Sequence, residues 1–202
     1  MLVTYKMLPI IILAAGKSRR FGDSDKRFTV LPHGGVLINA LVRRAKKTGL
    51  DVSVVINAKD MIADKIDAPC IVAPNAEQGM GASIADAVSV FAKRSAAESL
   101  LIMPADLPLL RIESLRRVAA SAAPNRIIVP ECEGRRGHPV AFGRQFWPLL
   151  RELTGDEGAR SVIANHHESV DIVEVQDEGI YRDADTPEEM RAVLSKLRPT
   201  LR

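Results

Sequence analysis

Short apolar runs alternate along this chain with longer segments in which apolar residues recur every three or four positions. Short runs of this kind are typical of buried strands, and the longer spacing is typical of helices that pack by one face. The pattern predicts strands at 9–14, 52–57, 69–73, 99–104, 126–130, 139–142 and 170–175. It predicts helices at 36–48, 81–94, 112–122, 144–153, 158–165 and 186–197.

The alternation of strands and helices indicates the fold class. Continuous apolar strands joined through helices form mostly parallel sheets with both faces covered. We therefore expect an α/β protein with a three-layer, Rossmann-like, mostly parallel sheet and helices on both faces. No repeat, low-complexity tract or long linker divides the 202 residues. A single domain over 1–202 is expected, with 1–8 as a disordered extension.

Composition narrows the class of function. The chain is 47% hydrophobic and 26% charged, and its formal net charge is +3. Lysine and arginine are scattered among acidic residues, which favours a local anion site over a nucleic-acid surface. Aromatic residues make up 4% of the chain, too few for a platform on which bases of a single strand stack. We expect no nucleic-acid partner.

Cysteine content and hydropathy bear on the compartment. The two cysteines, Cys70 and Cys132, lack the paired spacing of a zinc site, which indicates free thiols in a reducing compartment. No run approaches the ~20 apolar residues of a membrane span, and the first residues lack a secretory signal. The sequence predicts a soluble cytoplasmic protein with no membrane partner.

Two aspartates follow or precede predicted elements at positions suited to a ligand site. Asp106 comes directly after the strand at 99–104, and Asp185 lies in the loop before the last helix. Ligands of open α/β sheets bind beyond the carboxyl ends of the strands. Neither aspartate has a basic partner beside it in sequence, so we interpret them as two ligands of one hard cation such as Mg²⁺. The alternatives are a turn residue and a helix cap, and Asp183 competes with Asp185.

A small-residue turn, Ala14-Ala15-Gly16, ends the first strand and is followed by Arg20 and Lys26. A Walker A loop needs a glycine where Ile11 stands, and the closely spaced first glycines of a dinucleotide fingerprint are missing. Backbone amides of such a turn can still approach a phosphate or base, with the two cations on the phosphates. The alternative is an ordinary loop with solvated cations.

Two further segments carry candidate residues. Gly79, Gly81 and Ser83 lie at a helix entrance, where backbone donors can face a nucleotide or simply begin a helix. His138 lies at the start of a predicted strand between Gly137 and Pro139. An isolated histidine there is more often structural than catalytic.

These motifs together resemble the MobA-like nucleotidyltransferases, and within them the molybdenum cofactor cytidylyltransferases. The family opening, Leu-Ala-Ala-Gly-x-Ser-x-Arg-(Met/Phe)-Gly followed by Lys, is matched at 13–22 and by Lys26, one residue further on than in the pattern. Further matches lie, in the family's order, at 78–83, 104–108, 136–140, 155–160 and 183–189. The resemblance covers nearly the whole chain and implies the nucleotide-diphospho-sugar transferase type of fold.

The resemblance implies an Mg²⁺-dependent enzyme that moves CMP from CTP onto the phosphate of molybdenum-bearing molybdopterin and releases pyrophosphate. The implied nucleotide-binding residues are Leu13, Ala14, Ala15, Gly16, Arg20, Lys26, Gly79, Gly81, Ser83 and Asp106, of which Arg20, Lys26 and Asp106 are catalytic. The implied substrate-binding residues are Gly137, His138, Pro139, Asp156 and Arg160, and the implied metal ligands are Asp106 and Asp185. Guanylyl-transferring relatives usually have glycine at the position of Ala15, which favours CTP over GTP.

Two other functions stay open on the sequence. The first keeps the fold but uses GTP or another phosphorylated small molecule. The second is a carrier that delivers cofactor to a client molybdoenzyme without catalysing a transfer. The presence of both carboxylates together with the basic turn favours catalysis.

Overall fold

The computed structural model describes residues 8–16, 21 and 25–197. Their strands are β1 Pro9–Leu13, β2 Asp51–Asn57, β3 Cys70–Ala73, β4 Ser99–Pro104, β5 Ile127–Cys132, β6 Arg135–Arg136, β7 Val140–Gly143 and β8 Val170–Glu174. Their α-helices are α1 Leu37–Lys46, α2 Met80–Arg94, α3 Ile112–Ser121, α4 Trp147–Leu150, α5 Arg160–Asn165 and α6 Pro187–Leu194.

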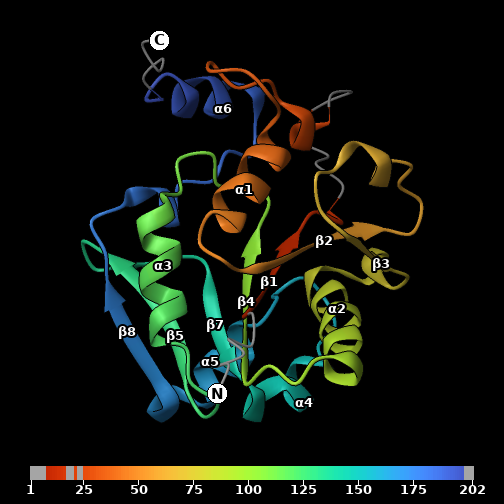
Figure 1. Ribbon diagram of the computed structural model, residues 1–202, viewed down its shortest axis with the longest axis vertical. Helices are drawn as coiled ribbons and strands as arrows, with labels where there is room; N and C mark the ends of the chain where they lie inside the picture. Colours follow the sequence, from red (N-terminus) through yellow and green to blue (C-terminus); the bar gives the residue numbers. More distant parts are fainter. Residues whose placement is uncertain (1–7, 17–20, 22–24, 198–202) are drawn as a thin grey trace, which may run out of the picture.

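All eight strands belong to one sheet with the order β3-β2-β1-β4-β7-β5-β6, and β8 pairs with β5 (Figure 1). The pairs β2–β3, β1–β2, β1–β4 and β5–β8 are parallel, and β7 is antiparallel to both β4 and β5. The prediction of a mostly parallel α/β sheet is confirmed. Because β7 is reversed, its first residues lie at the same edge as the last residues of β1, β4 and β5.

The reversal of β7 follows from the length of the connection before it. A parallel neighbour needs a crossover of a dozen or more residues, and residues 133–139 are too few. The chain instead turns tightly at Glu133 and Gly134, which have φ of 51° and 74°. This two-residue turn pairs Cys132 with Arg135, as expected where both central residues have positive φ.

Two sequence-based boundaries were wrong for physical reasons. The strand predicted to end at Pro130 continues to Cys132, because its end pairs with β6 in the hairpin. The helix predicted at 144–153 is a 3₁₀ turn, η5 Arg144–Phe146, followed by the single-turn α4. Other boundaries differ by one to three residues, within the usual uncertainty of helix and strand ends.

Two apolar clusters cover the two faces of the sheet. Ile10 and Ile12 pack with side chains of α1, α3 and α6 in one cluster. Ile11, which points the other way, packs with side chains of α2, α4 and α5 in the second. Successive side chains of a strand alternate between faces, so a strand that is buried on both faces is apolar throughout. This accounts for the unbroken apolar run of β1.

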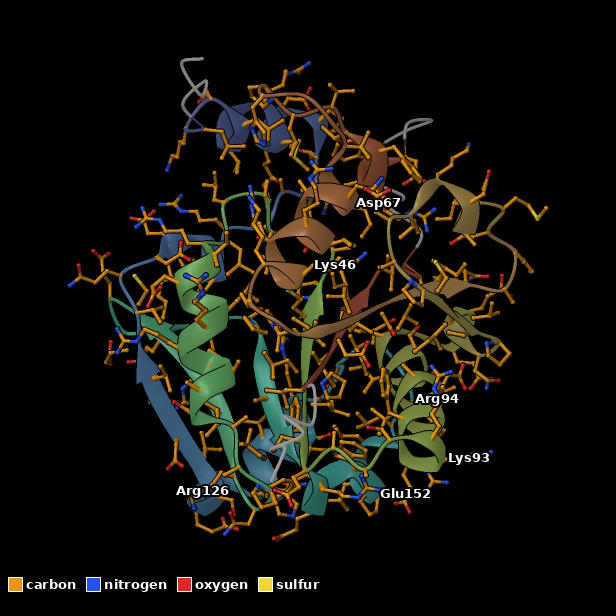
Figure 2. The ribbon with its side chains drawn as sticks, in the orientation of Figure 1. Lys46, Asp67, Lys93, Arg94, Arg126 and Glu152 are labelled. Atoms are coloured by element: carbon orange, nitrogen blue, oxygen red, sulfur yellow. The ribbon has the colours of Figure 1, made fainter. Side chains whose placement is uncertain are left out.

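Helix α2 runs from one end of the sheet to the other. Figure 2 shows Lys93 and Arg94, at the end of α2, in the lower right of the view. Arg126, just before β5, also lies at this end, where the strands begin. The entrance of α2 therefore lies at the opposite end, with the carboxyl ends of the parallel strands.

Both cysteines are free, with Cys70 half-buried and Cys132 buried. Among the helices of the described residues, none combines the length and the apolar character required to cross a bilayer.

Candidate nucleotide and metal site

A cavity of about 780 Å³ opens at the carboxyl ends of the parallel strands. Leu13, Ala14, Ala15 and Gly16, the turn after β1, line one side of it. The Ala14 amide donates to the Val55 carbonyl at 2.9 Å, which extends the sheet pairing into the turn. The amides of Ala15 and Gly16 donate no backbone hydrogen bond to any of the described residues. The turn is thus held by the sheet while later backbone donors are available to a ligand.

The entrance of α2 forms another wall, with Gly79 and Ser83 lining the cavity. Gly79 has φ of 112°, and a Cβ there would lie 2.3 Å from the Gly155 carbonyl oxygen. A Cβ on Gly81 would lie 2.5 Å from the Thr154 carbonyl oxygen. The Gly81 amide donates to the Gly155 oxygen at 2.7 Å, so it serves this packing and Gly81 does not line the cavity. These glycines let the loop at 154–158 approach the helix.

Replacing Gly79 with alanine is expected to lower the free energy of unfolding by about 3 kcal/mol, since it combines a strained φ with a backbone clash. Gly134 is a matched control, because its φ is also positive but an added Cβ would meet nothing within 4 Å. Gly134→Ala should cost about 1 kcal/mol. Urea unfolding measures both, and equal losses would contradict the close approach at Gly79.

Three carboxylates gather at the strand end beside the turn. Asp106, Asp183 and Asp185 each offer an oxygen within 4.8 Å of the others. Asp106 Oδ1 is buried and has no hydrogen-bond partner in the described residues. Burial, and then the charges of Asp106 and Asp185, raise the pKa of Asp183, while Lys26 opposes the shift. Clustered oxygens, one of them buried and unpaired, are chemically suited to a hard divalent cation.

Lys26 supplies a positive charge to this cluster. Its ammonium donates to Asp106 Oδ2 at 2.8 Å and lies 3.3 Å from Asp185 Oδ1, with 8% of the side chain exposed. The sequence showed no basic partner beside either acid, and the fold brings one from η2, Lys26–Phe28. The lysine predicted to contact phosphates therefore contacts the predicted metal ligands in this structure.

The start of α6 fixes Asp185. Thr186 and Glu189 form a capping box, and Pro187 occupies the first turn. Glu189 Oε2 accepts from the amides of Asp185 and Thr186 at 2.7 and 3.1 Å. The N-cap is therefore Thr186 and not Asp185, which leaves the Asp185 carboxylate to face the cluster.

The remaining predicted residues divide between the cavity and its surroundings. Asp156 lines the cavity, whereas Gly137, His138, Pro139 and Arg160 do not. The His138 amide donates to the Ile180 carbonyl at 2.8 Å, and the His138–Pro139 peptide is cis. Arg20 lies outside the described residues, so its contact with phosphate stays a prediction.

His138 lies within electrostatic reach of the acidic cluster. Burial lowers the pKa of its imidazole, the charge of Asp106 and a hydrogen bond to the Ile102 backbone act in the opposite direction, and Arg160 lowers the pKa further. Its Nδ1 atom is buried without a hydrogen-bond partner in the described chain. Because His138 is buried and does not line the cavity, its contact with a substrate stays a prediction.

Sequence reasoning missed three polar residues that line the cavity: Arg27, Asn57 and Glu77. Asn57 ends β2, so the rule that ligands bind at strand ends identifies it in retrospect. Arg27 follows Lys26 directly, and its local sequence carries no sign of the distant contacts that it makes.

A small-residue turn, a buried lysine and an acidic cluster at the carboxyl ends of the strands are the arrangement expected of an α/β protein that processes nucleotides. Comparison with known sequences agrees, since the MobA-like NTP transferase domain matches residues 10–170. The chain belongs to this family, and it is a nucleotidyltransferase by that membership.

Two curated relatives match most of the chain. The purine catabolism protein PucB of Bacillus subtilis (strain 168) is 32% identical over 193 residues, covering 89% of this chain and 92% of PucB. The nicotine blue oxidoreductase of Paenarthrobacter nicotinovorans is 29% identical over 202 residues, covering 91% and 95%.

Solved structures share the fold. The Rv0371c homologue from Mycobacterium sp. strain JC1 is 25% identical with a TM-score of 0.79, covering 94% of this chain and 96% of its own. Rv0371c of Mycobacterium tuberculosis in complex with manganese is 22% identical with a TM-score of 0.74, covering 94% and 99%. These similarities agree with the three-layer architecture.

Proposed function

We propose that this nucleotidyltransferase moves CMP from CTP onto the terminal phosphate of molybdenum-bearing molybdopterin. The acceptor phosphate oxygen forms a bond to the α-phosphorus of CTP, the bond from that phosphorus to the bridging oxygen breaks, and pyrophosphate leaves with the electron pair. The observation that carries the proposal is the single cavity that joins the turn after β1, Lys26 and the acids Asp106 and Asp185.

The protein need not supply a nucleophile, because a phosphate monoester oxygen is one. Its task is to bring two anions together and to stabilise charge on the leaving pyrophosphate. Asp106 and Asp185, with Asp183 beside them, would hold Mg²⁺, which offsets repulsion between the phosphates. Lys26 and Arg20 would donate to phosphate oxygens, and the amides of Ala15 and Gly16 would face the nucleotide.

The choice of cytosine rests on Ala15. This residue is 5% exposed and lines the cavity. Guanylyl-transferring relatives usually have glycine there, and we assign the preference for the smaller base to this added methyl group. On the acceptor side, we assign Asp156, His138 and Arg160 to molybdopterin, together with the turn at Gly137 and Pro139. A client molybdoenzyme would receive the product.

The purified protein, given Mg-CTP and metal-loaded molybdopterin, is expected to release pyrophosphate and form the cytosine dinucleotide. Parallel reactions with Mg-GTP, and with a sugar phosphate as acceptor, should be slower. Turnover of the sugar phosphate at the higher rate would instead favour a different acceptor. No pyrophosphate from Mg-CTP would reject the proposal.

Binding offers a second test of the nucleotide. A ligand that binds only the folded state raises the free energy of unfolding, by about 2.7 kcal/mol at a concentration of one hundred times its Kd, and so raises the melting temperature. Mg-CTP should therefore raise the melting temperature more than Mg-GTP at equal concentration. Equal shifts would contradict the role given to Ala15.

A further inference from the structure

Arg27 lines the cavity, yet all the hydrogen-bond donors of its guanidinium are engaged by acceptors of the protein itself. Nε donates to both Asp25 oxygens, at 2.8 and 3.1 Å, and Nη2 donates to Asp25 and Asp60, at 2.7 and 3.3 Å. Nη1 donates to the Ala14 carbonyl at 2.7 Å and to Asp60 at 2.6 Å. A guanidinium has five N–H donors, and these contacts engage all of them. Arg27 therefore has no free donor for a ligand.

The acceptors of Arg27 come from three separate segments. Ala14 belongs to the turn after β1, and Asp25 caps η2, accepting from the Arg27 amide at 3.0 Å. Asp60 follows β2, where it also accepts from the Asn57 amide at 3.2 Å. One side chain thus ties the turn to the end of β2 and to the short helix that carries Lys26.

Charge makes the same side chain important to an anionic ligand. Arg27 is one cation between two carboxylates, and its side chain is 14% exposed. Burial raises the pKa of Asp25, but the hydrogen bond and charge of Arg27 outweigh it, so the pKa lies below its ordinary value. Without Arg27, Asp25 and Asp60 would lose their ion-pair partner, and their charges would repel a triphosphate in the cavity.

We infer that Arg27 is a positioning residue: it holds the Ala14 carbonyl, and with it the nucleotide-facing turn, in place without touching the nucleotide. This inference rests on the proposed function, since it assumes that a triphosphate binds at the turn. A lysine at this position keeps the charge but presents one ammonium, which cannot reach three acceptors in the fork geometry of arginine.

The test compares Mg-CTP affinity, by isothermal titration, in the wild type, Arg27→Gln and Arg27→Lys. Arg27→Gln is expected to raise the Kd about tenfold to a hundredfold, the loss expected when hydrogen bonds to a charged group disappear. Arg27→Lys should recover less than half of that change on a logarithmic scale. Wild-type affinity in Arg27→Lys would overturn the inference, because charge alone would then suffice.

Arg126 provides the matched control. It also pairs bidentately with an aspartate, Asp171, but it lies at the other end of the molecule (Figure 2). Arg126→Gln should leave the Kd for Mg-CTP within twofold of the wild type. An equal rise in both variants would overturn the inference, since it would mean a general loss of stability.

The double variant Arg27→Gln, Asp60→Asn covers the case in which the single variant fails to fold. It removes one of the carboxylates left without a partner, so it should regain thermal stability while its Kd stays raised. Recovery of wild-type affinity would overturn the inference. If the wild type itself binds neither Mg-CTP nor Mg-GTP, the proposed function fails; if it binds and Arg27→Gln binds equally well, the role of Arg27 alone fails.

Discussion

Replacing Asp106 with asparagine will strongly reduce nucleotidyl transfer while leaving the fold intact. Asparagine has the same shape, and its Oδ1 can still accept the hydrogen bond that Lys26 makes at 2.8 Å. The change removes one charge from the three-carboxylate cluster, which weakens the hold on a divalent cation. We expect a rate about a thousandfold lower, or roughly 4 kcal/mol of lost transition-state stabilisation.

Pyrophosphate release measures the rate, and electron paramagnetic resonance of Mn²⁺ measures metal binding without relying on turnover. Asp64, an exposed acid, is the control, and Asp64→Asn should alter neither. A carrier without catalysis makes a different prediction, because Asp106→Asn would then still activate a client molybdoenzyme. That outcome would overturn the assignment of Asp106 to catalysis.

Replacing Lys26 with methionine will have two opposite effects. Transfer should fall at least about a hundredfold, because no ammonium remains to stabilise the phosphates. Metal affinity in the absence of nucleotide should rise about tenfold, because the ammonium no longer competes for the carboxylates it contacts at 2.8 and 3.3 Å. A role confined to packing would produce neither pattern.

Titration of Mn²⁺ into nucleotide-free protein checks the second effect. Lys59→Met is the matched control, since Lys59 also forms an ion pair, with Glu77 at 2.7 Å, but not with the clustered acids. It should leave Mn²⁺ affinity unchanged. A lower affinity in Lys26→Met than in the wild type would show that Lys26 supports the metal site instead of competing with the ion.

The strands, and the edge of the sheet that carries the site, could be predicted because a strand that is buried on both faces is apolar at every position. β4 was predicted with its observed bounds, Ser99–Pro104, since it is an apolar run between polar segments. The convergence of Asp106 and Asp185 followed from the rule about strand ends. The bounds of short elements such as α4 were not predicted, because a single helical turn is too short to show a periodicity.

Contacts between distant segments could not be predicted. Lys26 pairs with acids 80 and 159 positions away, and nothing beside it indicates either one. Arg27 was overlooked for the same reason, since Ala14 and Asp60 approach it only in the folded chain. Gly79 and Gly81 were predicted to contact a nucleotide, but the residues next to them in sequence gave no sign of the loop that packs on them.

The placement of α6 has a consequence for how the molecule is made. The match to the MobA-like domain ends at residue 170, whereas Asp183 and Asp185 lie beyond it, at the entrance of α6. Synthesis on the ribosome proceeds from the amino terminus, and early segments can begin to fold before later ones emerge. The acidic cluster is therefore completed late. A nascent or truncated chain that ends before residue 183 has the turn after β1 but lacks two of the three carboxylates of the cluster.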